Sequence, residues 1–280
     1  SAKILNGNIK NTPTIEATKL SKKLDCKLFL KLECLQLTSS FKTRGAYVAI
    51  RELNLNYPQK GVIAMSAGNH AQAVAYHAKN FGIPATIVMP EQAPFSKVAG
   101  TQELGAEVIL KGRNLNETAK FVENIATKKN LKLIHPYNDF DVIAGQGTIG
   151  IEIYNEICDL DYLIVPIGGG GLISGISIAM KKLNPNIRVV GVESKLFPSM
   201  YNIFNKSNHP CGGDSIADGI SVKQPGNINI PIIMDNIDDI FLVDEISIEN
   251  SISDLFEDER IISEGAGAAG VAAVLENKEF

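Results

Sequence analysis

The stretch from residue 61 to residue 110 reads GVIAMSAGNHAQAVAYHAKNFGIPATIVMPEQAPFSKVAGTQELGAEVIL, and its pattern decides the fold class. Short apolar runs of the kind found in buried strands occupy 61–66, 85–89 and 107–110. Segments with helical periodicity separate these runs, at 68–81 and 94–104. Strands that alternate with helices of about 10 to 15 residues indicate βαβ units and a parallel sheet.

The same alternation continues toward the C-terminus. Further strands are predicted at 131–134, 162–167, 188–192 and 240–243, and further helices at 116–129, 142–157, 172–183, 246–262 and from about 266 onward. Residues 200–235 are rich in Asn, Pro and Gly and are predicted to be irregular. Because the chain ends inside a predicted helix, where an open α/β sheet normally continues, we expect the C-terminal part to be truncated.

The composition excludes several classes of protein. The 280 residues include 27 Lys and Arg against 31 Asp and Glu, a net charge of −4, and 45% are hydrophobic. A sizeable core is therefore expected, with no general attraction for nucleic acid or an anionic membrane. The longest uncharged stretch, 162–180, contains Pro166 and four successive glycines and predicts a strand, a loop and a helix in water rather than a membrane span.

The cysteines are Cys26, Cys34, Cys158 and Cys211, and their spacing contains no CxxC motif or Cys/His ladder. This spacing favours reduced thiols over a disulfide framework or a zinc site. No secretory leader opens the chain, so we expect a cytoplasmic protein.

Four glycines and a leucine, Gly168 to Leu172, separate a predicted strand from a predicted helix. Backbone N–H groups bare of side chains at a helix N-terminus suit an anion, and no Lys-Ser/Thr follows to indicate a nucleoside-triphosphate loop. The run therefore favours a phosphate monoester held by the backbone. A merely flexible glycine turn is the alternative.

Two other segments contain polar groups at predicted helix starts. Lys42 follows Phe41, which is consistent with a desolvated amine able to form a Schiff base, although a lone lysine is ordinarily a surface charge. Ser66, Asn69 and His70 begin a helix after a strand and are suited to a carboxylate ligand, although Ser66 as a plain N-cap explains the pattern equally well.

Two further motifs mislead. Residues 145–150 (GQGTIG) satisfy GxGxxG, but no clear strand precedes them and no acid lies twenty residues later, so dinucleotide binding is disfavoured. Residues 39–42 (SSFK) match SxxK without the partner motifs of an acyl-serine enzyme.

In combination, five motifs resemble the fold-type II pyridoxal-phosphate enzymes, specifically the threonine dehydratase (threonine ammonia-lyase) family. They are SFKTRGA (40–46), SAGNHAQ (66–72), GQGTI (145–149), GGGGL (168–172) and SIADG (215–219). The resemblance extends from about residue 12 to residue 268. It implies an α/β fold of two open, mostly parallel twisted sheets flanked by helices. A large cofactor-binding domain would be formed by 1–52 and 141–280, with a small mobile domain at 53–140.

The resemblance also implies roles for individual residues. Lys42 matches the Schiff-base lysine, and Asn69 matches the residue that binds the phenolic oxygen of pyridoxal 5'-phosphate. The positions that match the phosphate-binding loop are Gly168, Gly169, Gly170, Gly171 and Leu172. The positions that match the substrate-carboxylate loop are Ser66, Ala67, Gly68, Asn69 and His70. A related branch binds a divalent cation just after the strand that ends at Glu193. Ser199 stands where that branch has an acidic ligand, so no metal is predicted.

The implied activity is β-elimination from L-threonine to give 2-oxobutanoate and ammonia, and from L-serine to give pyruvate. Such an enzyme would serve amino-acid metabolism, for example isoleucine biosynthesis, as a cytoplasmic homo-oligomer with a small-molecule amino-acid substrate and no nucleic-acid or membrane partner. An amino-acid racemase shares nearly every motif. A catalytically dead amino-acid-binding homologue is a further alternative.

Overall fold

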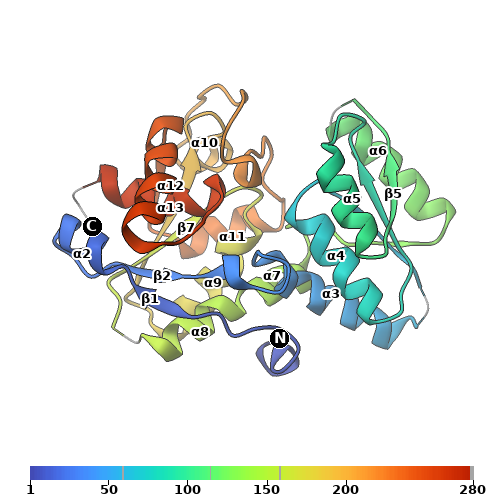
Figure 1. Cartoon of the computed structure of the whole chain (residues 1–280), viewed down its shortest axis with the longest axis horizontal. Coiled ribbons are helices and arrows are strands. Elements are labelled where there is room, and N and C mark those ends of the chain that lie inside the picture. Colours follow the sequence, from blue (N-terminus) through green and yellow to red (C-terminus); the bar gives the residue numbers. More distant parts are fainter. Residues whose placement is uncertain (59, 114, 158, 278–280) are drawn as a thin grey trace. The chain divides into compact units, whose positions relative to one another are not determined.

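The computed structural model describes residues 1–58, 60–113, 115–157 and 159–277. The chain divides into two compact units, which are described one at a time. Unit 1 comprises residues 1–10 and 35–146, and unit 2 comprises residues 11–34 and 147–280. Each unit has its own parallel sheet (Figure 1).

The helices and strands alternate as the sequence predicts. Unit 1 contains α1 (Ala2–Leu5), α3 (Lys42–Asn56), β3 (Val62–Met65), α4 (Asn69–Asn80), β4 (Ala85–Met89), α5 (Phe95–Glu103), β5 (Glu107–Leu110), α6 (Leu115–Lys128), β6 (Lys132–Leu133) and α7 (Phe140–Gln146). Unit 2 contains β1 (Thr14–Glu16), α2 (Thr18–Leu24), β2 (Phe29–Lys31), α8 (Thr148–Glu156), β7 (Tyr162–Pro166), α9 (Gly171–Leu183), β8 (Arg188–Ser194), α10 (Ser199–Phe204), η2 (Asp218–Ile220), α11 (Asn229–Asn236), β9 (Asp239–Val243), α12 (Glu245–Glu259) and α13 (Gly265–Glu276). A short helical turn, η1 (Glu33–Leu35), lies at the boundary.

The sheet of unit 1 has the strand order β5-β4-β3-β6, and its neighbouring strands are all parallel. Successive side chains of a strand point to opposite faces. Val62 and Ala64 of β3 accordingly pack in the core with α3 and α4, whereas Ile63 packs with Val122 of α6. Helices on both faces explain why these strands are nearly continuous apolar runs.

Helices α3 and α7 of unit 1 cross in close contact at two glycines. A Cβ atom added to Gly145 would lie 2.5 Å from the Cα atom of Gly45, and one added to Gly45 would lie 2.7 Å from the carbonyl oxygen of Val142. Each missing side chain is therefore replaced by the other helix's backbone. This contact fixes α3, whose first residue is Lys42, within unit 1.

The main sheet of unit 2 has the order β7-β8-β9, again parallel. Its residues Val192 and Val243 share a core with α12 and α13, which lie side by side (Figure 1). Helix α9 packs against β7, α8 and α11. Strands β1 and β2 form a separate antiparallel pair.

Two predictions of secondary structure were wrong. The predicted single helix at 142–157 is two helices, α7 and α8, separated at Gly147, where a Cβ atom would lie 2.8 Å from the carbonyl oxygen of Gly175. The predicted irregular segment 200–235 contains most of α10, the turn η2 and most of α11. The carboxylate of Glu193 accepts hydrogen bonds from the amides of Met200 and Tyr201, so α10 is begun by a contact that is not local in sequence.

Within the described ranges, no helix combines the length and the apolar character needed to cross a membrane. Cys26 and Cys211 form no disulfide bond with any described residue. Burial raises the pKa of both thiols. Cys158 lies outside the described residues.

Candidate active site

Strand order in unit 1 indicates where a ligand would bind. From β3 the chain adds β4 and β5 on one side, and β6 then pairs with the other side of β3. Open α/β sheets bind ligands at such a switch point, beyond the carboxyl ends of the strands. The segments that follow β3 and β6 are residues 66–68 and 134–139, and a ligand of unit 1 is expected to bind beside them.

The side chain of Lys42 forms a hydrogen bond with the segment that follows β6. It is the first residue of α3, and its Nζ atom donates a hydrogen bond of 2.9 Å to the carbonyl oxygen of Pro136. The ammonium also lies 5.1 Å from the centre of the Phe41 ring. Lys42 is half-buried, and its amine lies at the switch point beside the segment that follows β6.

The segment after β3 forms a tight turn. The hydroxyl of Ser66 accepts a hydrogen bond of 3.1 Å from the amide of Gly68, and Gly68, not Ser66, is the N-cap residue of α4. Ser66 therefore does not cap α4, and the alternative that Ser66 serves only as an N-cap is wrong. Among the described residues, the backbone amides of Ala67 and His70 donate no hydrogen bond, so both are available to an anion at the start of a twelve-residue helix.

The imidazole ring of His70 is buried and neutral. Its Nε2 atom lies 2.9 Å from the carbonyl oxygen of Ile134, which requires Nε2 to be the protonated nitrogen. Burial, with the nearby Lys42 charge as a smaller cause, lowers the pKa of His70 to about 3. Its Nδ1 atom is left as a buried acceptor without a partner among the described residues. The ring is therefore no cationic ligand for a carboxylate.

The segment after β6 was not singled out by the sequence analysis. His135 accepts hydrogen bonds at Nδ1 from the amides of Tyr137 (3.3 Å) and Asn138 (2.9 Å). Burial is the main reason why the pKa of His135 falls to about 4, and the charge of Lys42 contributes. Lys42 therefore lies among imidazole rings that are uncharged at neutral pH. One feature of the sequence could have identified this segment, because it is a polar stretch that directly follows a predicted strand.

The glycine loop of unit 2 follows β7 and begins α9. Gly170 has a φ of +91°, in the left-handed region that favours glycine. A Cβ atom on Gly168 would lie 3.1 Å from the Cα atom of Ile220, so the backbone is closely packed on that side. Among the described residues, the amides of Gly168 to Leu172 donate no hydrogen bond. Bare amides at the N-terminus of a thirteen-residue helix fit a phosphate group well.

The predicted site residues are divided between the two units. Unit 1 brings together Lys42 and the loop from Ser66 to His70, while Gly168 to Leu172 lie in unit 2. Their roles toward a ligand remain predictions.

Ser199, predicted to stand in place of an acidic metal ligand, donates a hydrogen bond of 3.2 Å to Glu193. Burial raises the pKa of Glu193 to about 7, although this bond and the amides of Met200 and Tyr201 lower it. Nowhere in the described ranges do three or more His, Cys, Asp or Glu side chains gather in an arrangement that could hold a metal ion.

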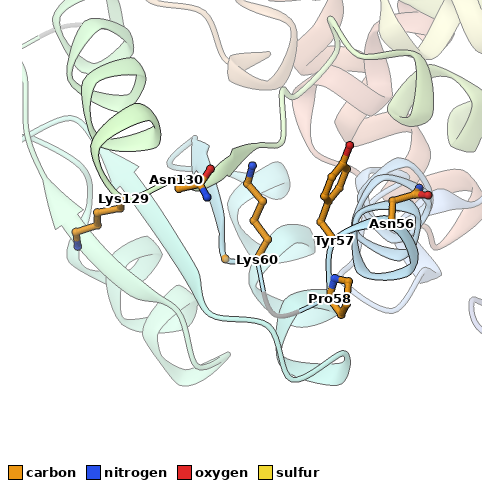
Figure 2. Close-up of a pocket in the computed structure, with 7 residues that line it drawn as sticks. Asn56, Tyr57, Pro58, Lys60, Lys129 and Asn130 are labelled. Atoms are coloured by element: carbon orange, nitrogen blue, oxygen red, sulfur yellow. The ribbon is translucent and has the colours of Figure 1, made fainter.

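A surface hollow of about 740 Å³ lies elsewhere in unit 1. It is lined by Asn56, Tyr57, Pro58, Lys60, Gly61, Lys129 and Asn130. Figure 2 shows the ammonium of Lys60 turned toward Asn130, while that of Lys129 points away. The charges do not converge, and no predicted site residue lines the hollow, so we assign it no function.

Comparison with known proteins agrees with this geometry. Residues 5–280 match the family described as "Pyridoxal-phosphate dependent enzyme". The chain belongs to this family, and pyridoxal 5'-phosphate is its cofactor. The resemblance deduced from the five motifs, the α/β class and the parallel sheets are thereby confirmed.

Individual relatives show which members of this family the chain resembles. The chain is 44% identical over 273 residues to an L-threonine ammonia-lyase of Thermotoga maritima, covering 97% of this chain and 68% of the relative. It is 46% identical over 274 residues to a Staphylococcus aureus protein named "L-threonine dehydratase catabolic TdcB", covering 96% and 79% respectively. Among solved structures, maize serine racemase aligns with a TM-score of 0.95 at 34% identity, covering 100% of this chain and 86% of that one.

Proposed function

We propose that this protein is an L-threonine ammonia-lyase, which converts L-threonine to 2-oxobutanoate and ammonia and L-serine to pyruvate and ammonia. The observation that supports it most directly is the position of Lys42, whose amine lies at the switch point beside the loop from Ser66 to His70. Two relatives named for threonine at 44% and 46% identity support the same substrate.

Pyridoxal 5'-phosphate, when bound, acidifies the Cα–H bond of an amino acid by withdrawing electrons. Lys42 would anchor the cofactor and, once displaced by substrate, act as the base at Cα. Gly168 to Leu172 would hold the phosphate through their amides, and Asn69 would bind the phenolic oxygen. Loss of the β-hydroxyl as water and hydrolysis of the nitrogen-bearing product then release the 2-oxo acid and ammonia, with no net consumption of water.

The substrate carboxylate is assigned to the loop after β3. The amides of Ala67 and His70 and the hydroxyl of Ser66 supply donors at the positive end of α4. Gly68 leaves the turn without a side chain, and nothing lies within 4 Å of the position its Cβ would occupy. The His70 ring contributes by bonding to Ile134, which holds the loop in place.

Ala67 separates the lyase from the racemase. Racemisation would need a proton donor on each face of the substrate Cα atom, and Lys42 can serve only one face. In racemases that resemble this chain, a serine stands at the position of Ala67, and a methyl group can neither donate nor accept a proton. Loss of the β-hydroxyl is therefore expected to predominate over racemisation.

The proposal is tested on the enzyme with a panel of L-threonine, L-serine and their D-isomers. We expect 2-oxo acid release from the two L-amino acids and little D-serine from L-serine by chiral chromatography. D-serine formed as fast as pyruvate would overturn the lyase assignment. A dead homologue would lack turnover and any visible absorbance of bound cofactor that borohydride abolishes.

The remaining expectations belong to the same proposal. We infer a small mobile domain at 53–140, which contains the whole parallel sheet of unit 1 and the carboxylate loop. We further infer a homo-oligomer in the cytoplasm, acting on amino acids and not on nucleic acid, in keeping with the net charge of −4. Small-angle scattering with and without substrate, and sedimentation of the loaded enzyme, test the domain motion and the oligomer.

A further inference from the structure

The carbonyl oxygen of Gly169, in the middle of the glycine loop, accepts two hydrogen bonds. One comes from the amide of Gly226 at 3.0 Å, and the other comes from the side-chain Nδ2 atom of Asn229 at 2.9 Å. Asn229 is fully buried and is the first residue of α11, which packs against α9 (Figure 1). The loop is therefore held from behind by a side chain.

These two bonds fix the direction of the next amide. In a trans peptide the C=O of one residue and the N–H of the next point in opposite directions. Because the Gly169 carbonyl points to Asn229, the Gly170 N–H points away from α11. The packing agrees, since a Cβ on Gly170 would lie 2.9 Å from the Cβ of Asn229 and 2.8 Å from the Cδ1 of Ile233.

The first turn of α11 is held by a backbone hydrogen bond. The N-cap residue of α11 is Ile228, which makes no side-chain cap bond, and the backbone amide of Asn229 already bonds to the carbonyl of Gly226 at 2.9 Å. A buried amide is retained at a cost in desolvation unless it is hydrogen-bonded, and here one of its bonds goes to the glycine loop.

We propose that Asn229 is a positioning residue for the cofactor phosphate, which orients the Gly169–Gly170 peptide so that the Gly170 N–H faces the anion. This inference rests on the proposed role of Gly168 to Leu172. Asn229 contributes no charge, so it orders a donor in advance without weakening the positive end of α9. Gly226 alone provides a single bond, whereas two bonds determine the plane of the peptide.

The test compares two ligands that differ only in the phosphate. The full chain, freed of cofactor, is titrated with pyridoxal 5'-phosphate and in parallel with pyridoxal. Asn229→Ala should raise the Kd for pyridoxal 5'-phosphate about tenfold, as expected for a misdirected charge-assisted bond, and leave the Kd for pyridoxal within about twofold. Asn229→Asp, which places a carboxylate behind the loop, should weaken pyridoxal 5'-phosphate further.

Asn236→Ala is the matched control. Asn236 lies on the same helix and its Nδ2 atom bonds to the carbonyl of Ile232 at 2.8 Å, away from the glycine loop. The Asn236→Ala substitution should leave the Kd values for pyridoxal 5'-phosphate and for pyridoxal unchanged. Asn229→Leu, which keeps the volume, gives the same comparison if the alanine variant fails to fold.

The possible outcomes distinguish a failure of the Asn229 inference from a failure of the proposed phosphate-binding role of Gly168 to Leu172. A wild-type chain that binds the two ligands equally well would overturn the phosphate loop and the inference together. A wild-type chain that prefers pyridoxal 5'-phosphate, with variants that lose affinity for both ligands alike or for neither, would overturn the role of Asn229 alone.

Discussion

Lys42 and His70 bind carbonyl oxygens that are two residues apart in the chain. The Lys42 amine bonds to Pro136 at 2.9 Å, and the His70 ring bonds to Ile134 at 2.9 Å. Residues from two different helices are thereby aligned on one short segment at the carboxyl edge of the sheet. The ring that accompanies the lysine is neutral, so it does not repel the ammonium.

Replacing Lys42 tests the proposed anchor and base. Lys42→Ala should lower 2-oxo acid formation from L-threonine by at least about 10³-fold, because one group supplies both functions. Thermal unfolding followed by circular dichroism should change little. Lys60→Ala, at the surface hollow of the same unit, should retain activity; more than trace turnover by Lys42→Ala without added amines would contradict the assignment.

Ala67→Ser should introduce the missing proton donor. We expect the variant to form D-serine from L-serine at least about tenfold faster than the unmodified enzyme, since a hydroxyl can donate where a methyl group cannot. Chiral chromatography measures both isomers beside pyruvate. Ala126→Ser, on α6, is the matched control and should form no more D-serine than the parent. Equal rates in the two variants would show that position 67 does not decide the outcome.

The crossing of α3 and α7 should not accept a methyl group. Gly145→Ala places a Cβ 2.5 Å from backbone, where no side chain can yield, and should reduce the free energy of unfolding by about 2 kcal/mol or more. Gly270→Ala in α13 meets only ordinary contacts near 3.8 Å and should be neutral or stabilising by about 0.5–1 kcal/mol. Urea unfolding measures both, and equal effects would refute the packing argument.

Acid should destabilise the protein through its buried imidazoles. Burial lowers the pKa of His77 from 6.5 to about 4, so folding favours the neutral ring. Its stabilising contribution is complete above pH 6.5 and is lost as the pH falls toward 4. Below pH 6.5, His77→Gln should show a shallower decline of unfolding free energy, by up to about 1.4 kcal/mol per pH unit.

Urea titrations at pH 7.5, 6.5 and 5.5 provide the comparison of wild type and His77→Gln. Glu193, with its pKa raised to about 7, acts with the opposite sign, because its neutral form is the favoured one in the fold. That contribution is common to both proteins and cancels in the difference. Parallel pH profiles for wild type and variant would contradict the burial of a neutral His77.

The sequence predicted the fold best where local pattern and burial coincide. The predicted strands 85–89 and 107–110 match β4 and β5 residue for residue. Strand β4 is buried along its whole length and lies between Pro84 and Pro90, so its sequence is a bounded apolar run. Strand β5 follows Gly105 and is only half-buried at its two central residues. Prediction failed where distant contacts decide. The start of α10 depends on Glu193, and no local pattern shows that carboxylate reaching Met200.

The same division applies to the candidate site. Lys42 and the two glycine-containing loops were recognisable because each directly begins a helix. The segment from His135 to Asn138 was missed because its importance depends on β6 pairing with β3, and strand order is not written in a local pattern. Asn229 was missed for a related reason, since it acts on a loop sixty residues away.

The meeting of Gly45 and Gly145 has a consequence for how this chain can change over generations. Lys42 lies one turn before Gly45, so a shift of the crossing would move the amine. Gly145 faces the backbone of α3, and Gly45 faces the carbonyl oxygen of Val142 as well as the side chains of Gln146 and Val142; the backbone atoms cannot shrink to make room. A larger residue at one position therefore has no partner whose replacement could restore the fit. In proteins that depend on this lysine, neighbouring positions should therefore vary, whereas Gly45 and Gly145 should remain glycine.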